Sequence, residues 1–486
     1  MTERKKGYNP KDAKSVFEYG KKLVGKTFGQ IIEENADQDK EELVEKYSNK
    51  SRKGGLGNLI EEVYFGYEAN TKQEADFSEA GVELKTTPYE KGKKGALRAG
   101  ERLVLTKINF NEPVEDDFYK SHAWEKMKSI LLIHYLRDKS LESNLSYVID
   151  YVNLFSPPEA DLEIIKRDYE FIINKIKEGL AHELSEGDTM YLGACTKGAT
   201  AEKSVGPQYY GDKIPAKNRA FCLKTSYMTY VLNHYIAGEP SNNSILNNVS
   251  QLKEKTFEQI LKDIVDKYVG KTDKELCQLF GRKYNNNKAQ WNDLVCRILG
   301  IRDEHADEFE KANISIKTIR IEENGNIREN MSFKTFRFME LAEEEFEESS
   351  LYNLFFEKRY FFVVWKKVGD EYKLQGCQLW NMPYNDLNVI VRREWEACQK
   401  VVRDGVQFKK KVDRSGKISF ENNFPNKSET EIIHIRPHAK KAAYRFKDGR
   451  EYGNVEKDAN MLPNGEYMTT QSFWLNNDYV LKQLKI

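Results

Sequence analysis

The sequence lacks an excess of charge, a cysteine motif and a long apolar run. Its 486 residues include 77 basic and 77 acidic side chains, so the charge of the whole chain gives no indication of a polyanionic partner. The six cysteines form no C-x-x-C pair and no zinc-ligand spacing, and the seven histidines are scattered. We therefore predict no zinc site, and we interpret the cysteines as the reduced thiols of a cytoplasmic protein.

Targeting and membrane segments are also missing from the sequence. Residues 1–7 lead into charged sequence without the apolar core of a signal peptide. No stretch is long enough to span a membrane, so we expect no membrane partner. The length of the chain exceeds that of one ordinary hydrophobic core and predicts about two to four domains.

The most informative motif that is present consists of an acid, a six-residue gap and a Glu-x-Lys triplet. Asp76, Glu83 and Lys85 form it. Side chains alternate along a strand, so Glu83 and Lys85 should share one face while Val82 and Leu84 point into the core. Two carboxylates and an ammonium group are then expected to converge.

This combination suits the hydrolysis of a phosphodiester bond. Mg²⁺ is usually held by one or two carboxylates together with the phosphate of the substrate, and it lowers the pKa of a water. Asp76 and Glu83 can supply the carboxylates, and Lys85 can orient the attacking water and stabilise the transition state. A surface Glu-Lys pair on a half-exposed strand is the alternative, and the neighbouring sequence argues against it.

A helix is predicted before this motif. Leu56, Leu59, Ile60 and Val63 recur at the spacing i, i+3, i+4 and i+7, which indicates a helix with one buried face. Glu62 lies at the edge of that face.

The run Gly57–Gly66, followed by Asp76-Phe77 and Gly81–Thr86, resembles the MutH and Sau3AI family of DNA endonucleases. The resemblance implies the restriction-endonuclease fold, an α/β fold with a mixed sheet flanked by helices, and recognition of GATC. It also implies that a helix glutamate fourteen residues before the aspartate serves the metal site. That spacing selects Glu62, and we interpret its neighbour Glu61 as a solvated charge.

The family pattern continues after the motif. Residues 102–108 predict a strand, and residues 121–128 predict a helix that leads into another strand at 130–133. The resemblance makes Lys126 a further functional lysine, although a cation at a helix end is also expected from the helix dipole alone. A basic cluster follows the Glu-x-Lys strand, and we interpret it as a set of DNA phosphate contacts, with a solvated loop as the alternative. The cluster consists of Lys91, Lys93, Lys94, Arg98, Arg102 and Lys107.

The chain also repeats itself. Val24–Thr27 returns as Val269–Thr272, and Glu83–Thr86 has a degraded echo in Ser315–Thr318. The distance of 232 residues from the lysine of Glu-x-Lys to its echo, Lys317, also separates Lys126 from Lys358. We therefore predict two homologous domains, at 1–238 and 253–486, joined by a polar linker at 239–252. Chance similarity between short charged helices is the alternative.

Two later pairs of segments support the repeat. Arg167–Glu170 parallels Arg393–Glu396, and Phe221–Leu223 parallels Phe473–Leu475. The offset changes between pairs, as expected where loops tolerate changes of length.

The two copies differ in chemistry. Ser315, Cys296 and Glu308 take the positions of the three predicted carboxylates of the first copy. A single acid should hold Mg²⁺ poorly, so we predict that the second domain does not cut DNA. Asp307 or Glu310 could substitute in a shifted register, but neither restores a Glu-x-Lys pair.

The second copy nevertheless keeps a binding loop. Ile435–Ala439, with Arg436 and His438, resembles the base-reading loop of the family. Arg436 can make the bidentate contact to guanine that discriminates bases by roughly 1–3 kcal/mol.

The first copy has Cys195 in place of that arginine. We therefore expect DNA binding there to depend on Lys197 and Gly198. Lys224 is a candidate for a phosphate contact, with a solvated lysine at a helix end as the alternative.

The resemblance covers nearly the whole chain and implies a type II restriction endonuclease. In this hypothesis the first domain cuts and the second binds another GATC copy as an effector. One active site per chain requires either DNA-induced pairing of two chains or sequential nicks for a double-strand break. The resemblance also implies a cognate methyltransferase in the host. Two alternatives are a strand nickase of the mismatch-repair type and a GATC-binding regulator that does not cut.

Overall fold

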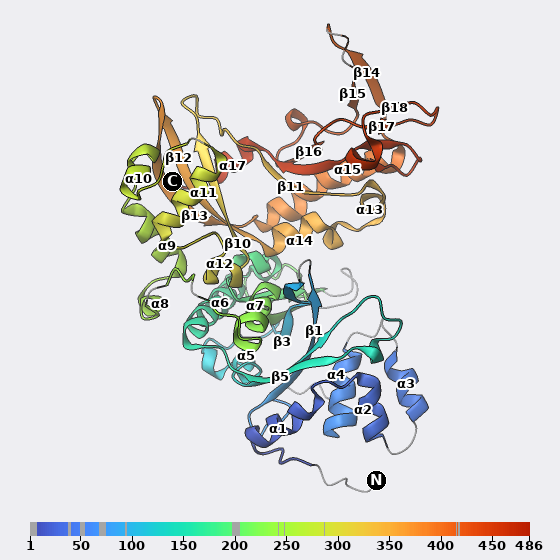
Figure 1. The fold of residues 1–486 in the computed structure, drawn as a ribbon. Coiled ribbons are helices and arrows are strands. Elements are labelled where there is room, and N and C mark those ends of the chain that lie inside the picture. The colour runs from blue at the N-terminus through green and yellow to red at the C-terminus, as the bar shows by residue number, and fades with distance from the viewer. Residues whose placement is uncertain are drawn as a thin grey trace. The chain divides into compact units, whose positions relative to one another are not determined.

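The computed structural model describes residues 7–36, 40–48, 54–67, 74–92, 95–196, 205–241, 243–246, 248–285, 287–414, 416 and 418–486. The chain divides into two compact units, and each contains helices and mixed sheet (Figure 1). Unit 1 comprises Met1–Lys255 with His305–Asn313, and unit 2 comprises Thr256–Glu304 with Ile314–Ile486. The predicted linker at 239–252 therefore falls within unit 1. Among the described helices, none is long and apolar enough to cross a membrane.

Unit 1 contains two larger sheets that are covered by helices, and a two-stranded sheet, β7-β8. One larger sheet has the strand order β2-β1-β4-β5, and the other has the order β3-β9-β6. The strands are β1 (Glu83–Lys91), β2 (Leu97–Ala99), β3 (Leu103–Ile108), β4 (Ile130–Leu136), β5 (Ile149–Phe155), β6 (Leu192–Thr196), β7 (Val205–Gly206), β8 (Ala216–Lys217) and β9 (Arg219–Leu223). The helices are α1 (Ala13–Gly20), α2 (Phe28–Asn35), α3 (Lys40–Ser48), α4 (Gly55–Leu59), η2 (Ile60–Phe65), α5 (His122–Glu125), α6 (Glu159–Lys177), α7 (Thr225–Tyr230), η9 (Val231–Ile236), α8 (Gln251–Glu254) and α12 (Asp307–Lys311).

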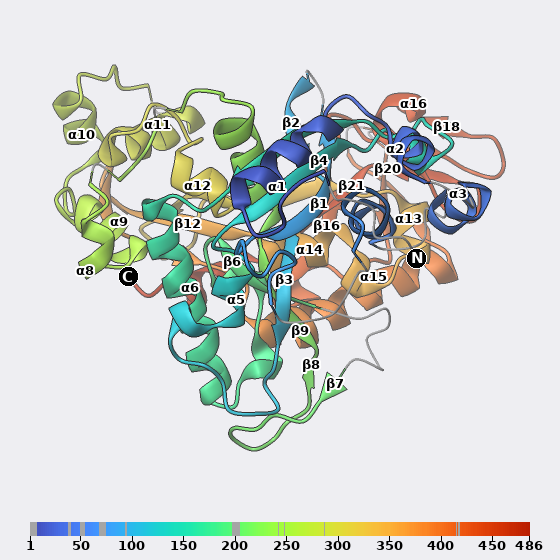
Figure 2. The same ribbon diagram turned by 90° about the horizontal axis from the view of Figure 1, so that it is seen from below.

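The N-terminal helices pack on the sheet that carries the Glu-x-Lys motif. Figure 2 shows α1 lying across this sheet. A glycine suits this close approach, because a Cβ at Gly20 would lie only 3.2 Å from the side chain of Leu131 of β4. The Thr27 side chain accepts from the backbone N–H of Gln30 and so caps α2. The buried side chains of these helices hold β1 in place from one side.

The predicted helix around Leu59 is confirmed, with one difference. Leu56, Leu59 and Ile60 are buried, as the spacing requires. From Ile60 onward the helix widens into a π-helix, η2, and it ends at Gly66 in the left-handed conformation (φ 68°). A π turn contains more residues than an α turn, so side chains after Ile60 leave the positions that an α-helical count gives them.

Unit 2 has the same kind of architecture. One sheet has the order β10-β12-β13, and another has the order β11-β21-β16. A two-stranded sheet, β14-β15, and a four-stranded sheet of short strands, β18-β17-β20-β19, complete the unit. The strands are β10 (Ile314–Ile321), β11 (Met331–Thr335), β12 (Arg359–Val368), β13 (Glu371–Trp380), β14 (Phe408–Val412), β15 (Ile418–Asn422), β16 (Ile433–Pro437), β17 (Tyr444–Arg445), β18 (Glu451–Tyr452), β19 (Ala459–Met461), β20 (Tyr467–Thr469) and β21 (Gln471–Leu475). The helices are α9 (Phe257–Asp266), α10 (Asp273–Leu279), α11 (Lys288–Leu299), α13 (Phe338–Glu343), α14 (Ser350–Glu357), η11 (Asp386–Val391), α15 (Arg392–Asp404), α16 (Val455–Asp458) and α17 (Asn477–Gln483).

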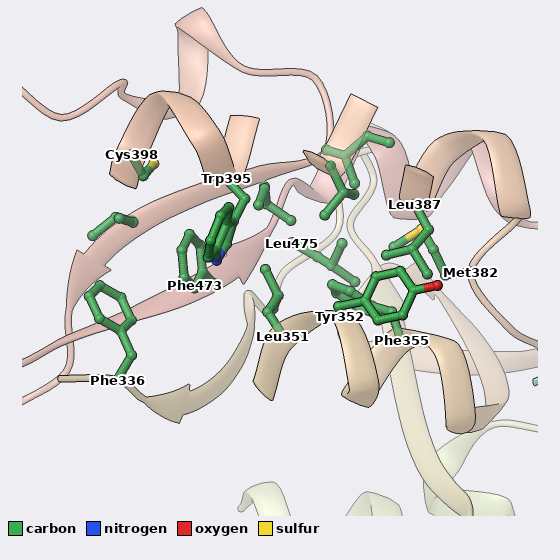
Figure 3. Packing of buried hydrophobic residues seen from close by; sticks show 14 of the residues in the cluster. Phe336, Leu351, Tyr352, Phe355, Met382, Leu387, Trp395, Cys398, Phe473 and Leu475 are labelled. Carbon is green, nitrogen blue, oxygen red and sulfur yellow. The ribbon is translucent and has the colours of Figure 1, made fainter. Parts of the chain in front are cut away.

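The core of unit 2 is rich in aromatic side chains. Figure 3 shows Trp395 of α15 between the strands and the α14 helix, with Phe473 and Leu475 of β21 beside it. Trp395 and Leu475 are at most 1% exposed. Burial of such side chains supplies most of the stabilisation that holds these layers together.

The two units share one strand connectivity. In unit 1, β1 pairs in parallel with β4, and β4 pairs antiparallel with β5. In unit 2, β10, β12 and β13 pair in the same two ways. The second sheets also correspond, because β9 lies between β3 and β6 as β21 lies between β11 and β16, with antiparallel pairing throughout.

In each unit, one buried acid accepts hydrogen bonds from the backbone at the start of a strand. Asp168 on α6 accepts hydrogen bonds from the backbone N–H groups that lead into β6, including that of Leu192 at 2.9 Å. Glu394 on α15 accepts from the N–H groups that lead into β16, including that of Ile433 at 2.8 Å. These residues are the acids of the two parallel sequence segments around 168 and 394.

The constant sequence offset does not extend to the strand register. Glu83 pairs with Ile130, but Ser315 pairs with Tyr360. The offset is therefore 232 residues at β1 and β10 and 230 residues at β4 and β12. Lys126 and Lys358 consequently do not occupy one register, although each follows the last residue of a helix. The interpretation that both segments keep a single register is wrong, because α14 and the turn after it differ in length from α5 and its turn.

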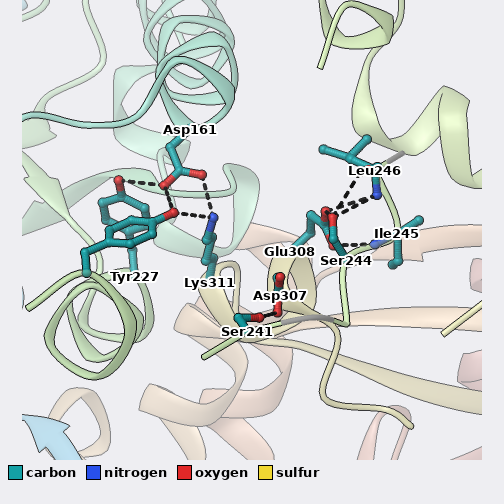
Figure 4. Close-up of polar contacts among 10 residues, drawn as sticks. Asp161, Tyr227, Ser241, Ser244, Ile245, Leu246, Asp307, Glu308 and Lys311 are labelled. Carbon is teal, nitrogen blue, oxygen red and sulfur yellow. Dashed lines mark hydrogen bonds and ion pairs between the residues drawn. The ribbon is translucent and has the colours of Figure 1, made fainter. Parts of the chain in front are cut away.

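Helix α12 packs entirely within unit 1, although β10 directly after it belongs to unit 2. Its Lys311 donates to Asp161 of α6 at 2.6 Å and to the hydroxyl of Tyr235 at 2.8 Å (Figure 4). The ammonium group also lies 4.5 Å from the ring centre of Tyr230. Both members of the ion pair are buried, with side chains 9% and 2% exposed.

Both carboxylate oxygens of Glu308, on the same helix, accept hydrogen bonds. Its carboxylate accepts from the Ser244 hydroxyl at 2.6 Å and from the N–H groups of Ile245 and Leu246 at 3.0 and 3.1 Å (Figure 4). This acid, which the sequence offset equates with Asp76, therefore fixes a turn of unit 1.

We expect Lys311→Met to lower the free energy of unfolding of unit 1 by about 3–5 kcal/mol, because it leaves Asp161 buried without its counter-charge. Chemical denaturation of the full chain measures this change. Lys253→Met is the matched control. Lys253 pairs with Glu159, which lies on α6 as Asp161 does, but this ion pair is exposed and should contribute less than about 1 kcal/mol. Equal effects of the two substitutions would contradict the anchoring role of α12.

Candidate active site

A closed turn brings Asp76 beside the start of β1. Phe77 and Val82 exchange backbone hydrogen bonds across the turn, and Gly81 has the positive φ of 65° that the turn requires. The Asp76 carboxylate accepts from the N–H of Leu84 at 2.9 Å, and the Asp76 N–H donates to the Glu83 carboxylate at 3.3 Å. The six-residue gap of the motif is this turn, and the strand itself begins at Glu83.

Glu83 is the centre of the site. It is 1% exposed, and each of its oxygens accepts from one lysine. Lys85, two residues along β1, donates to Oε1 at 2.7 Å, and Lys126, directly after α5, donates to Oε2 at 2.9 Å. The lysines differ in exposure, since the Lys85 side chain is 25% exposed and that of Lys126 is 9% exposed.

Two acids of the site have raised pKa values. Burial, and next the charge of Glu83, raise the pKa of Asp76 to about 6. Burial, and next the charge of Asp76, raise the pKa of Glu61 to about 7. Carboxyl groups that the fold forces together in this way have a strong electrostatic preference for a cation among them.

Glu61 thus differs from its sequence interpretation. It is partly buried and interacts with the charges of Asp76, Glu83 and Lys85, so the interpretation as a solvated charge is wrong. Glu62 instead accepts from the ammonium group of Lys46 at 2.7 Å and from the hydroxyl of Tyr47 at 2.5 Å.

The two glutamates are neighbours on one helix but have different partners. The count of fourteen residues back from Asp76 is a spacing implied by the family resemblance, and both glutamates lie on η2, which begins at Ile60. Periodicity in the sequence gives no signal for a π turn. The assignment of a metal-ligand role to Glu62 stays a prediction, and the charges around Glu61 favour Glu61 for that role.

The donor set of the site fits a hard divalent cation. Mg²⁺ is usually held by one or two carboxylates, with water and substrate phosphate completing its coordination, and Asp76 and Glu83 provide two carboxylates in adjacent positions. Within the described residues, no three acidic, histidine or cysteine side chains already form a complete ligand group. In this structure, the lysines occupy both Glu83 oxygens that a cation would share.

The predicted DNA-binding residues have different positions. Lys197 and Gly198 lie outside the described residues. Arg436 is exposed, with its guanidinium 5.1 Å from the ring centre of Trp474, and His438 lies 2.8 Å from the hydroxyl of Ser472 through its Nδ1. Both residues therefore lie where a ligand of unit 2 can reach them.

The equivalence of Cys195 and Arg436 agrees with the strand register. Each is the fourth residue of its strand, and each pairs with the central strand of its sheet, at Ala220 and Ser472 respectively. Cys195 is 2% exposed, so it does not replace the arginine as a surface contact.

The position of Lys224 contradicts the roles that the sequence predicted for it. It is 3% exposed, and its ammonium group donates to the carbonyl of Thr189. Its charge also lies close to the buried Asp168. Lys224 is therefore an internal counter-charge in this structure, and neither predicted role, phosphate contact or solvated helix-end lysine, fits its position.

The members of the basic cluster after the motif differ in exposure. Lys91, Arg98 and Lys107 are exposed, whereas Arg102 forms an ion pair with the buried Glu186. Lys93 and Lys94 lie outside the described residues.

Comparison with known proteins agrees with this site. Residues 65–168 match the family model described as DNA mismatch repair enzyme MutH. The chain is 35% identical to the type II restriction enzyme Sau3AI of Staphylococcus aureus over 97% of this chain and 98% of that enzyme. It is 26% identical to the DNA mismatch repair protein MutH of Shigella flexneri serotype 5b, over 46% of this chain and 93% of that protein. The MutH protein of Escherichia coli O127:H6 is 28% identical over 39% of this chain and 81% of its own length.

Proposed function

Since this chain belongs to the MutH/Sau3AI family and is a type II site-specific deoxyribonuclease, we propose that it cuts double-stranded DNA at GATC in a Mg²⁺-dependent reaction. Unit 1 carries the active site in this proposal. The observation that supports it best is the arrangement around Glu83, where two lysines and a second carboxylate converge on one buried acid. Such a site is built for a metal ion and a phosphate together.

Each side chain has a distinct role in this proposal. Asp76 and Glu83 hold the metal, and Glu61 binds it or one of its waters. When bound, the cation neutralises charge on the phosphate and lowers the pKa of the attacking water. Lys85, the more exposed lysine, orients that water and contacts the phosphate. Lys126, nearly buried, positions the Glu83 carboxylate.

We further propose that unit 2 is a non-cutting homologous domain that binds a second GATC copy as an effector. Ser315 stands in the Ser-x-Lys segment of β10 where β1 has Glu83. Glu308, the remaining acid, is committed to a turn of unit 1. Arg436 meanwhile remains exposed for a base contact.

Digestion of plasmids with zero, one and two GATC sites tests this function. Linear fragments that map to GATC, require Mg²⁺ and form faster with two sites are the expected result. Open circles alone would indicate a strand nickase of the mismatch-repair type. A mobility shift on GATC without cleavage would indicate a non-cutting regulator, and either of these results would overturn the proposal.

We expect Arg436→Ala to weaken binding of the effector copy by roughly 5- to 150-fold, the equivalent of one lost guanine contact. Cleavage of a one-site plasmid should be unchanged, and the stimulation by a second site should disappear. Rates on one-site and two-site plasmids measure this effect. Arg337→Ala is the control, because Arg337 is an exposed arginine of the same unit with only a weak ion pair. Unchanged two-site stimulation in the Arg436 variant would remove the effector role.

The setting of the enzyme follows from this function. We propose a cytoplasmic protein whose macromolecular partner is GATC-containing DNA, with a cognate methyltransferase protecting the host. Because unit 1 alone cuts, two chains must associate on the DNA or one chain must nick both strands in turn. Sedimentation of the protein with and without a GATC duplex distinguishes these two routes.

A further inference from the structure

Unit 2 contains a cavity between α11 and β10. Its volume is about 500 Å³, within the range of about 300–1,000 Å³ that is typical of small-molecule sites. Its charged lining consists of Lys288 of α11, Lys317 of β10, Glu304 and Glu329, and Trp291, Asn330 and Asn477 contribute apolar and amide surface. The cavity lies beside the Ser-x-Lys segment, and so occupies the place that the metal site has in unit 1.

The residue at the glutamate position of the motif differs between this cavity and unit 1. Glu83 separates Lys85 from Lys126 in unit 1, whereas β10 has a serine, Ser315, at the glutamate position. Burial, and next the charge of Lys288, lower the pKa of Lys317. Burial, and next the charge of Lys317, lower the pKa of Lys358. Lysines therefore repel one another here.

Two glutamates line the cavity beside the two lysines, and each has a partner of its own. No hydrogen bond or ion pair of the Lys317 ammonium group is found among the described residues. Glu304 provides a nearby negative charge and accepts a hydrogen bond from Asn292 at 3.3 Å. Glu329, which also lines the cavity, forms an ion pair with Arg320.

The helix adds to the positive potential. Lys288 is the first residue of α11, a helix of 12 residues that Asn287 caps. The positive end of the helix dipole therefore lies at the wall of the cavity. A phosphate group would satisfy the lysines and the helix end together, and lysine is a common phosphate ligand that acts as a point charge.

We propose that this cavity is a metal-free binding site for the phosphate of a nucleotide unit, with Lys317 and Lys288 as its principal ligands. Asn330 and Asn477 line the same cavity, where the sugar or base attached to the phosphate can pack. The phosphate belongs either to a free nucleotide or to a DNA strand. The inference goes beyond the proposed function, because it assigns a ligand group and the residues that hold it, independently of GATC recognition by Arg436.

Titration of the full chain in EDTA tests this proposal. The probes are inorganic phosphate, deoxyguanosine monophosphate and a GATC duplex, and the readouts are calorimetric affinity and thermal unfolding. Wild type is expected to bind and to unfold at a higher temperature with ligand. Lys317→Met should bind at least about tenfold more weakly, because a charge-assisted hydrogen bond is lost. Its unfolding temperature without ligand should not fall, since the substitution removes a repelled charge.

Two further variants complete the experiment. Ser315→Glu restores the carboxylate of unit 1 between the lysines and is expected to abolish phosphate binding. Lys267→Met, at an exposed lysine of the same unit, is the control and should bind as wild type does.

The pattern of losses identifies the source of the phosphate. Weaker binding of all three probes by Lys317→Met supports a site for free nucleotides, and weaker binding of the duplex alone supports a DNA strand. Equal binding by wild type, Lys317→Met and Ser315→Glu would overturn the proposal. Loss of two-site stimulation in Arg436→Ala with phosphate binding intact would leave the two proposals clearly separated.

Discussion

Glu83→Gln is expected to reduce cleavage of a GATC duplex by at least about a thousandfold, because a metal ion supplies several kcal/mol of transition-state stabilisation and each 1.36 kcal/mol is tenfold in rate. The substitution keeps the shape of the side chain and removes the charge that Lys85 and Lys126 share. Binding of the duplex in EDTA should persist or become tighter, because one negative charge near the phosphates is gone. Single-turnover cleavage and fluorescence anisotropy measure the two quantities.

A matched control lies on the same strand. Glu90, also on β1, pairs with Arg137 at 2.8 Å and with Lys139 at 3.3 Å. Glu90→Gln therefore also removes a carboxylate held by two cations, but away from the candidate site, and cleavage should stay near the wild-type rate. Cleavage by Glu83→Gln within tenfold of wild type would disprove the assignment of the active site.

Glu61→Gln is expected to lower activity by about 10- to 100-fold, the usual effect of losing a side chain that supports a metal site. The same substitution at Glu62 should leave activity nearly unchanged, because Glu62 pairs with Lys46 and Tyr47. Cleavage rates measured across a range of Mg²⁺ concentrations distinguish the two variants, since loss of a metal ligand raises the concentration that is required.

Each of these two glutamate variants serves as the control for the other. Both lie on η2, so a general disturbance of the helix should affect both variants. A large loss for Glu62→Gln with normal activity for Glu61→Gln would restore the assignment made by counting residues. Melting curves of both proteins would show whether either substitution alters the fold.

The local parts of the site could be predicted from the sequence. Alternation along a strand places Glu83 and Lys85 on the same side, and their contact at 2.7 Å has this geometry. The helix before the motif and the strand at β4 were also predictable, because apolar spacing reports directly on burial. Strands β3 and β4 begin within one residue of the expected positions.

Other features depended on contacts between distant residues. Lys224 resembles a surface lysine in sequence, but the fold buries it against the carbonyl of Thr189. Glu308 was expected to retain a metal-ligand position, but α12 packs within unit 1 and its carboxylate caps a turn at 244–246. Composition and spacing contain no information on such partners.

The sequence by itself therefore determined the chemistry of the protein, since the acid, Glu-x-Lys and family motifs are short and their side chains converge through local strand geometry. Only the tertiary structure decided which helix glutamate lies near the charges of the other acids, that the segment 305–313 belongs to unit 1, and that two lysines line a cavity at β10. The physical reason is that these features depend on packing between distant segments and on the electrostatic field of many residues. None of these is a property of a local stretch of sequence.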